Sequence, residues 1–297
     1  MTQTLLVTGA SGHLGRSVLG HLLDSLKVDP ARIVAGSRKP DDLAAWAKRG
    51  VRTVRADFDD VASLDAAFAG VSRILLISTD SLDRPGRRLA QHKVAIDAAA
   101  RARVPHVIYT SMPDPETSAV SFAPDHVGTE EALRQSGIPG FTLLRDNWYF
   151  ENLLLAMPQV IASGKWYSAA GTGATAHIAR NDIGRAAATA LASPQSGHTT
   201  LTLTGARAYS TNEIARIVSE RVARPIEVVP VTVDGLVAGL LQAGVPEPIA
   251  RTLASFDANI AQGGLATVTG DFKALTGAEP VTFEAWVEAN KAALIGA

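Results

Sequence analysis

Cysteine is absent from the 297-residue chain, which excludes disulfides, thiolate nucleophiles and cysteine-ligated metal sites. Aromatic residues are scarce, at 5% of the chain. Neither sign of charge dominates, since the chain has 28 basic and 29 acidic residues. The composition therefore indicates no binding surface for nucleic acid or an anionic membrane. The first apolar run, at 5–7, is too short for a signal peptide or a membrane span. We expect a reduced, cytoplasmic protein, and the spacing of its seven histidines predicts no metal site.

Short β-like runs alternate with helical patterns through the first half of the chain. Strands are predicted at 4–8, 32–37, 51–57, 72–78, 104–111 and 140–145. The first intervening helix is predicted at about 14–26, because Leu14, Val18, Leu22 and Leu26 recur every four residues. Six strands that alternate with helices predict an α/β fold, a Rossmann-type doubly wound parallel sheet with helices on both faces.

Beyond residue 146 the alternation loosens. A helix is expected near 149–163, strands at 165–168 and 199–205, and a helix that a capping box opens at Ser210-Thr-Asn-Glu213. We therefore predict an NAD(P)-binding Rossmann domain over 1–150 and a smaller C-terminal α/β substrate-binding region over 151–297. Part of that region, about 175–205, is expected to return to the core.

A glycine-rich turn, TGASGHLG at 8–15, separates the first predicted strand from the first helix. Glycine permits a tight turn at Gly9, close approach of a pyrophosphate at Gly12 and close helix–strand packing at Gly15. The amino end of the helix offers free N–H groups to phosphates. The alternative is a generic strand-to-helix turn, but the surrounding β/α units favour dinucleotide binding.

The end of the second strand indicates which dinucleotide binds. An NAD site usually carries an acidic residue there, whereas this chain has Gly36-Ser37-Arg38-Lys39. A guanidinium can bind a 2′-phosphate through two hydrogen bonds, so NADP(H) is favoured, the alternative being a solvated Arg–Lys pair. After the third strand, Asp57 and Phe58 are expected beside the adenine, unless Asp57 caps the next helix. The predicted cofactor site comprises Gly9, Ser11, Gly12, His13, Leu14, Gly15, Arg38, Asp57, Phe58 and Ser78.

The turn and the alternation resemble the short-chain dehydrogenase/reductase superfamily, whose ordinary members donate a proton from a Tyr-x-x-x-Lys pair. No tyrosine here has a lysine four residues later, and Phe122 stands where that tyrosine is expected. There is no lysine between Lys93 and Lys165. Ordinary alcohol–ketone chemistry is therefore disfavoured.

The chain resembles the atypical, NmrA-like branch of that superfamily, and within it the bacterial NADPH:quinone oxidoreductase 2 type, with the triphenylmethane reductases as near relatives. The resemblance rests on TGASGHLG, SRKP, VIYTS, His126-x-x-Thr129-Glu130 and above all LLRDNWYFEN at 143–152. This chain departs from the family at Asp146-Asn147, where the pattern reads Asn-Gly. The resemblance implies that the residues after the sixth strand line the substrate site, namely Asp146, Asn147, Trp148 and Tyr149.

The implied function is NADPH-dependent hydride transfer to a quinone or related conjugated or aromatic acceptor. No catalytic residue is certain, and the candidates are Ser111, His126 and Tyr149, with structural roles equally open for the first two. The aromatic run at 148–150 either lines the acceptor site or fastens the next helix to the core, and both can hold. A different class of function is a non-catalytic NADP-binding redox sensor that acts through a protein partner. A homodimer is left open.

Overall fold

The computed structural model describes residues 3–82 and 84–296, and the chain divides into two compact units. The units are interleaved along the sequence, because the chain leaves the first unit and returns to it twice. The first unit consists of Met1–Met112, Asp125–Arg145 and Asn181–Leu201, and the second of Pro113–Pro124, Asp146–Arg180 and Thr202–Ala297. The functional division into a nucleotide-binding domain and a substrate-binding region stays a prediction.

A seven-stranded sheet is the centre of the first unit, and the predicted doubly wound fold is confirmed. Its strands follow the order β3-β2-β1-β4-β5-β6-β9, and the pairs from β3 to β6 are parallel. Strand β9 runs the same way, since the N–H groups of Phe141 and Asn147 donate to Gly197 and Leu203 in step. The strands span Leu5–Val7 (β1), Ile33–Ser37 (β2), Arg52–Arg55 (β3), Arg73–Leu76 (β4), His106–Ser111 (β5), Gly140–Asp146 (β6) and His198–Leu203 (β9).

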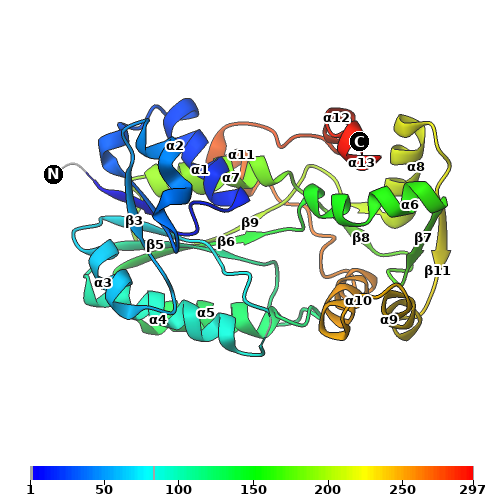
Figure 1. Ribbon diagram of the computed structural model, residues 1–297, viewed down its shortest axis with the longest axis horizontal. Coiled ribbons are helices and arrows are strands. Elements are labelled where there is room, and N and C mark those ends of the chain that lie inside the picture. Colours follow the sequence, from blue (N-terminus) through cyan, green and yellow to red (C-terminus); the bar gives the residue numbers. More distant parts are fainter. Residues whose placement is uncertain (1–2, 83, 297) are drawn as a thin grey trace. The chain divides into compact units, whose positions relative to one another are not determined.

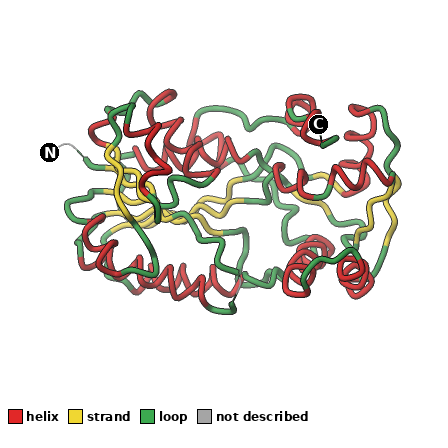
Figure 2. Tube along the Cα trace, in the orientation of Figure 1, coloured by secondary structure: helices red, strands yellow, loops and turns green. Residues whose placement is uncertain are grey.

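Helices cover both faces of this sheet (Figure 1), and Figure 2 shows the strands enclosed between them. On one face lie α1 (His13–Gly20), α2 (Ala44–Ala47) and α7 (Arg180–Ala192), and on the other lie α3 (Val61–Phe68), α4 (Arg87–Arg101) and α5 (Ala123–Gln135). The predicted helix at about 14–26 is present, but its second half is not α-helical. The α-helix ends at Gly20, and a π-helical turn over His21–Ser25 follows, in which His21 Nδ1 lies 2.9 Å from Ser25 Oγ.

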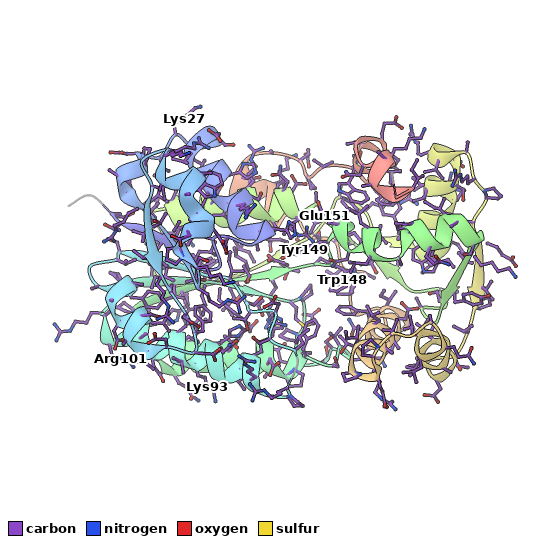
Figure 3. All side chains as sticks on the ribbon, in the orientation of Figure 1. Lys27, Lys93, Arg101, Trp148, Tyr149 and Glu151 are labelled. Atoms are coloured by element: carbon purple, nitrogen blue, oxygen red, sulfur yellow. The ribbon has the colours of Figure 1, made fainter. Side chains whose placement is uncertain are left out.

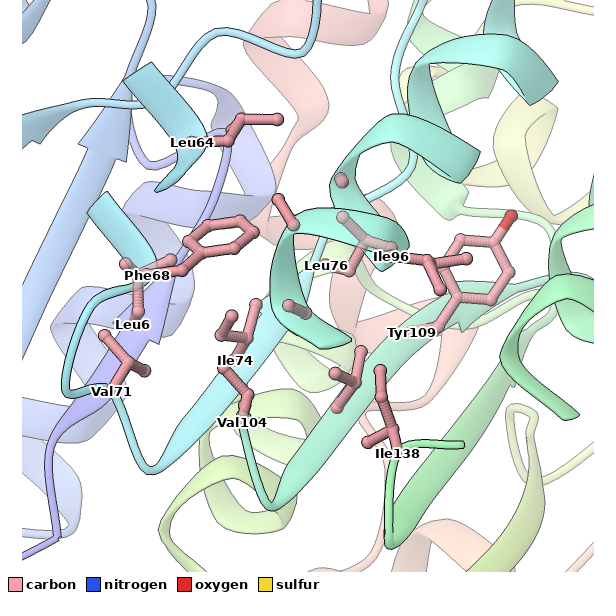
Figure 4. Packing of buried hydrophobic residues seen from close by; sticks show 14 of the residues in the cluster. Leu6, Leu64, Phe68, Val71, Ile74, Leu76, Ile96, Val104, Tyr109 and Ile138 are labelled. Atoms are coloured by element: carbon pink, nitrogen blue, oxygen red, sulfur yellow. The ribbon is translucent and has the colours of Figure 1, made fainter. Parts of the chain in front are cut away.

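Apolar side chains from β1, β4 and β5 pack with α3 and α4 into a buried cluster (Figure 4). Leu6, Phe68, Ile74 and Tyr109 are at most 1% exposed within it. A strand covered on both faces must be apolar along its whole length, which is why these strands do not alternate with polar residues. Tyr109 brings a hydroxyl to one side of the cluster (Figure 4).

The second unit holds two small sheets and most of the C-terminal helices. Strand β7 (Lys165–Ser168) pairs in parallel with β11 (Glu227–Pro230), and β8 (Ala174–Thr175) pairs antiparallel with β10 (Tyr209–Ser210). The capping box is confirmed, since Ser210 and Glu213 bond each other's backbone N–H at the start of α8. The helices are α6 (Met157–Ser163), α8 (Thr211–Val222), α9 (Val233–Gln242), α10 (Glu247–Ala261), α11 (Asp271–Thr276), α12 (Phe283–Ala289) and α13 (Lys291–Leu294).

The predicted helix at 149–163 is two elements, a 3₁₀ helix over Phe150–Leu155 and then α6. Phe150 is 2% exposed and stacks near Phe283 and Trp286, with ring centroids 5.1 and 5.4 Å away. These rings anchor the apolar core of the second unit. Within residues 3–82 and 84–296, no helix is long and apolar enough to cross a membrane.

Gly15 allows α1 to pack closely on the end of β1. A Cβ at this position would lie 2.4 Å from Gly9 O and 2.6 Å from Ala10 Cα, both backbone atoms that cannot rotate away. We expect Gly15→Ala to lower the free energy of unfolding by about 1–3 kcal/mol, as overpacking does, in urea denaturation. Gly20→Ala on the same helix is the control, because nothing lies within 4 Å of its added Cβ. A Gly15→Ala protein as stable as Gly20→Ala would contradict this packing.

Candidate functional site

The turn between β1 and α1 presents free backbone N–H groups. Gly9 has φ +58°, a left-handed conformation that glycine adopts without strain. Gly12 is exposed and takes the N-cap position, where no side chain of the described residues caps α1. The first N–H groups of a helix have no partner within it. The amino end of α1 therefore offers unpaired donors and the positive end of a helix dipole, the arrangement that binds phosphate.

Two threonines link the strand ends around this turn, and neither was predicted as a site residue. The hydroxyl of Thr8 donates to Leu75 O and accepts from the Ile77 N–H, both at 3.0 Å. The hydroxyl of Thr110 accepts from the Ser78 N–H at 2.9 Å and lies 3.2 Å from Ser78 Oγ. Ser78 is thus fixed at the carboxyl end of the sheet. The sequence carries one signal for this role, a threonine that follows the apolar residues of a buried strand.

A hydroxyl group of the turn lies next to one at the end of β2. Ser11 Oγ lies 3.0 Å from Ser37 Oγ, and Ser37 Oγ also accepts from the Lys39 N–H at 3.2 Å. Arg38 follows with an exposed side chain. His13 is exposed on the first turn of α1, whereas Leu14 is buried. The end of β2 therefore carries hydroxyl and guanidinium donors at the place where an NAD site carries an acid.

Asp57 and Phe58 follow β3. The carboxylate of Asp57 accepts from the Asp59 N–H at 3.1 Å and from Arg55 at 3.0 Å. The alternative that Asp57 caps the next helix is wrong, because Asp60 is the N-cap of α3 and accepts from the Ser63 N–H. Phe58 is 8% exposed and belongs to the buried cluster of the first unit.

Ser111 belongs to a buried ionic network around Glu130. Its hydroxyl donates to Glu130 Oε1 at 2.7 Å, and the guanidinium of Arg145 binds both carboxylate oxygens at 3.0 and 2.7 Å. Arg134 donates to Glu130 Oε2 at 2.9 Å. The side chain of Glu130 is fully buried, while that of Arg145 is 14% exposed. Glu130 stands in the family motif at 126–130, but its partners Ser111 and Arg145 lie 19 and 15 residues away, too far along the chain for the sequence to reveal them.

His126 is held in a second buried network. Its Nε2 lies 3.0 Å from Arg88 Nη2, and its Nδ1 lies 2.9 Å from the Tyr109 hydroxyl. Because a guanidinium can only donate, Nε2 accepts and Nδ1 carries the proton. Burial, and then the charge of Arg88, lowers the pKa of His126 well below 6.5. His126 is therefore a neutral imidazole with both ring nitrogens bonded.

His92 extends this network to the loop after β4. Its Nε2 accepts from the Thr79 N–H at 3.0 Å, and its Nδ1 lies 2.9 Å from Thr129 Oγ1. Burial lowers the pKa of His92 to about 3, and the charge of Arg88 adds to this effect. The neutral ring holds the loop next to Ser78 in place. No motif of the sequence points to this role of His92, because Thr129 is 37 residues away.

The run at 146–150 divides into residues of different kinds, and Figure 3 labels Trp148 and Tyr149. Phe150 is core, as described above, whereas Trp148 and Tyr149 are each half-buried. The Trp148 ring lies on Phe256 with centroids 3.7 Å apart, and Arg180 lies over the Tyr149 ring at 5.4 Å. Phe150 is thus buried in the helix-anchoring core, whereas an acceptor site lined by Trp148 and Tyr149 stays a prediction.

Asp146 and Asn147 are both buried. The amide of Asn147 donates to Leu265 O at 3.1 Å and accepts from the Trp148 N–H at 2.7 Å, so backbone groups occupy it. Asp146 Oδ2 accepts from the Tyr149 hydroxyl at 3.2 Å. Substrate contacts of these residues stay predictions.

A doubly wound parallel sheet with a glycine turn and an uncapped helix at the end of its first strand defines a dinucleotide-binding protein. The chain belongs to the NmrA-like family, whose model matches residues 1–286. The predicted resemblance is confirmed.

Individual relatives agree with this assignment. The chain is 34% identical to Quinone oxidoreductase 2 of Escherichia coli (strain K12) over 263 residues, 88% of this chain and 89% of the relative. It is also similar to two solved structures. The E. coli NADPH-dependent quinone oxidoreductase complexed with NADPH has a TM-score of 0.90 at 33% identity, covering 96% of this chain and 98% of its own. The Citrobacter sp. triphenylmethane reductase complexed with NADP(H) has a TM-score of 0.89 at 32% identity, with 96% and 99% covered.

The Glu130–Arg145 pair is expected to be a structural anchor. Glu130→Gln removes the carboxylate charge that binds the largely buried guanidinium of Arg145 through both oxygens, and breaking a buried pair from one side costs about 3–5 kcal/mol of unfolding free energy. The matched control is Arg134→Gln, which removes the other guanidinium on Glu130. The Arg134 side chain is 43% exposed, so this change should cost less than about 1 kcal/mol. Equal losses in urea denaturation would contradict the assignment.

Proposed function

We propose that the chain is an NADPH-dependent oxidoreductase that transfers a hydride to a quinone or a related conjugated or aromatic acceptor. The observation that carries the proposal is the uncapped amino end of α1 beside the Ser11–Ser37 hydroxyl pair, with Arg38 in place of an acid. The E. coli relative is named a quinone oxidoreductase, and its solved structure holds NADPH. The triphenylmethane reductase structure holds NADP(H).

The residues of the turn fit this cofactor. The exposed Gly12 carries no side chain that would fill the space a pyrophosphate needs, and the free N–H groups after it, in the turn that contains His13 and Leu14, suit two phosphates. Ser37 and Arg38 supply the hydrogen-bond donors that a 2′-phosphate requires. When bound, the nicotinamide supplies the hydride. The chain itself binds and orients both molecules, which is much of what such a transfer requires.

The acceptor is proposed to lie against Trp148 and Tyr149. Both side chains are partly exposed, and each packs on a neighbour, Trp148 on Phe256 and Tyr149 under Arg180; an aromatic ring can pack in this way and still line a ligand site. A planar conjugated acceptor gains from stacking on such rings, whereas an aliphatic ketone does not. The chain lacks the Tyr-x-x-x-Lys pair that donates a proton to an ordinary ketone. This absence fits an acceptor that is electrophilic enough to take a hydride without that pair. We further propose action in the cytoplasm without a nucleic-acid partner, and a homodimer as the assembly.

The function is tested by mixing the protein with NADPH and para-benzoquinone and following the NADPH absorbance. Consumption of one NADPH per quinone reduced, dependent on the protein, is the expected result. Tight NADPH binding with no consumption for any quinone or conjugated acceptor would overturn the proposal and favour the redox-sensor alternative.

Arg38→Ala should weaken NADPH binding by about 1–3 kcal/mol, the contribution of a charge-assisted hydrogen bond. NADH lacks the 2′-phosphate, so its affinity should hardly change. Fluorescence titration measures both dissociation constants, and Lys39→Ala is the neighbouring control for loss of one positive charge. Equal losses for NADPH and NADH would remove Arg38 from the 2′-phosphate site.

Trp148→Ala should lower kcat/KM for quinones by about 1–3 kcal/mol if acceptor stacking resembles the stacking of bases on aromatic side chains. The NADPH dissociation constant should stay within a factor of about two. Phe150→Ala is the structural control, because truncating this buried ring costs about 3–5 kcal/mol of stability. A Trp148→Ala protein that melts early yet reduces quinones normally would place Trp148 in the core alone.

A further inference from the structure

One carboxylate oxygen in the second unit is buried without a partner. Asp146 is 8% exposed, and its Oδ2 accepts from the Tyr149 hydroxyl at 3.2 Å. Its Oδ1 has no hydrogen-bond partner among residues 3–82 and 84–296. A buried, unpaired carboxylate charge is costly, whereas a neutral acid with its proton on Oδ1 avoids that cost. The geometry therefore indicates a carboxylic acid whose O–H finds no acceptor in the described part of the chain.

The charges around Asp146 agree with the neutral form. Burial raises the pKa of Asp146 well above 3.8, and only the hydrogen bond from Tyr149 opposes it among the described residues. Burial also raises the pKa of Tyr149 well above 10, with Asp146 adding to the effect, so Tyr149 keeps its proton. Arg180 lies over the Tyr149 ring, and Glu151 accepts from the Arg180 N–H at 2.9 Å. Both act on the pKa of Tyr149.

The other candidate proton donors are occupied. Ser111 donates its hydroxyl proton to Glu130, and His126 uses its one N–H toward Tyr109. Neither can protonate an acceptor without breaking a buried hydrogen bond. Asp146 is placed differently, at the last position of β6 and three residues from Tyr149.

We propose that Asp146 is the proton donor to the carbonyl oxygen of the acceptor, and that Tyr149 is the positioning residue that holds its carboxyl group. The inference rests on the proposed function. Reduction of a quinone needs a hydride, which carries two electrons and one hydrogen, and one further proton. The Oδ1–H bond of Asp146 breaks as the O–H bond of the reduced acceptor forms. Asp146 is left as a carboxylate, which takes a proton from water before the next turnover.

The protonation of Asp146 is measured without turnover, by infrared spectroscopy of the protein alone. The wild type should show the carbonyl-stretch band of a protonated carboxylic acid at neutral pH, and Asp146→Asn should lack it. The difference between the two proteins assigns the band, because the pKa values of Asp125 and Asp257 are also raised by burial. No difference at any pH at which the enzyme works would overturn the proposal.

Turnover gives a second test through two acceptors. A quinone needs a proton, whereas a triphenylmethane cation accepts a hydride at its central carbon and becomes neutral without one. Asp146→Asn should lower the ratio of quinone to dye kcat/KM by about 100-fold, the lower end of general-acid contributions. A ratio that stays the same, or a loss larger for the cationic dye, would contradict a neutral donor.

The pH dependence of quinone kcat/KM distinguishes the proton donor, Asp146, from the positioning residue, Tyr149. A donor acts only while protonated, so quinone kcat/KM should fall as pH rises through the pKa of Asp146, and Asp146→Asn should lose this fall. Tyr149→Phe removes the hydrogen bond that lowers this pKa and should move the fall to higher pH. An unmoved fall in both variants would sink the assignment. Failure of the proposed function looks different, since the wild type would then consume NADPH with neither acceptor.

Discussion

The proposed cofactor site depends on the close contact between helix α1 and the glycine-rich turn that follows β1. Only a residue without a Cβ fits at Gly15, where backbone atoms of Gly9 and Ala10 occupy the space. That contact fixes the direction of α1, and with it the free N–H groups at its amino end. Ser11, in the same turn, lies 3.0 Å from Ser37 at the end of β2. The turn that Gly15 allows therefore lies next to the strand end that carries the proposed 2′-phosphate contacts.

A second constraint acts where β6 ends. Successive residues of a strand point to opposite faces, so Arg145 and Asp146 cannot share an environment. Arg145 enters the buried carboxylate network of Glu130, where its charge is balanced. Among the described residues, the carboxyl group of Asp146 hydrogen-bonds the Tyr149 hydroxyl alone. A charged pair and a neutral acid thus stand side by side in the sequence, and the difference between them comes from the partners that the fold supplies.

Local patterns of the sequence predicted the local parts of this structure well. Apolar runs alternating with helical periods gave the parallel sheet, and the glycine spacing and the capping box at Ser210 are short-range signals. The extent of α1 was missed, because its periodic leucines continue through a π-helical turn. The roles of Ser111 and His126 were left open, because partners such as Glu130 and Arg88 are 19 and 38 residues away. The run at 148–150 could not be divided either, since burial of Phe150 depends on rings more than 130 positions later.

The most direct measurement is a crystal structure of the chain with NADP⁺. The pyrophosphate should accept hydrogen bonds at about 3 Å from the backbone N–H groups at the start of α1. The 2′-phosphate should contact Ser37 and Arg38. A dinucleotide bound away from this turn, or an adenosine ribose held by a carboxylate and not by the β2 end, would contradict the assignment of the cofactor site.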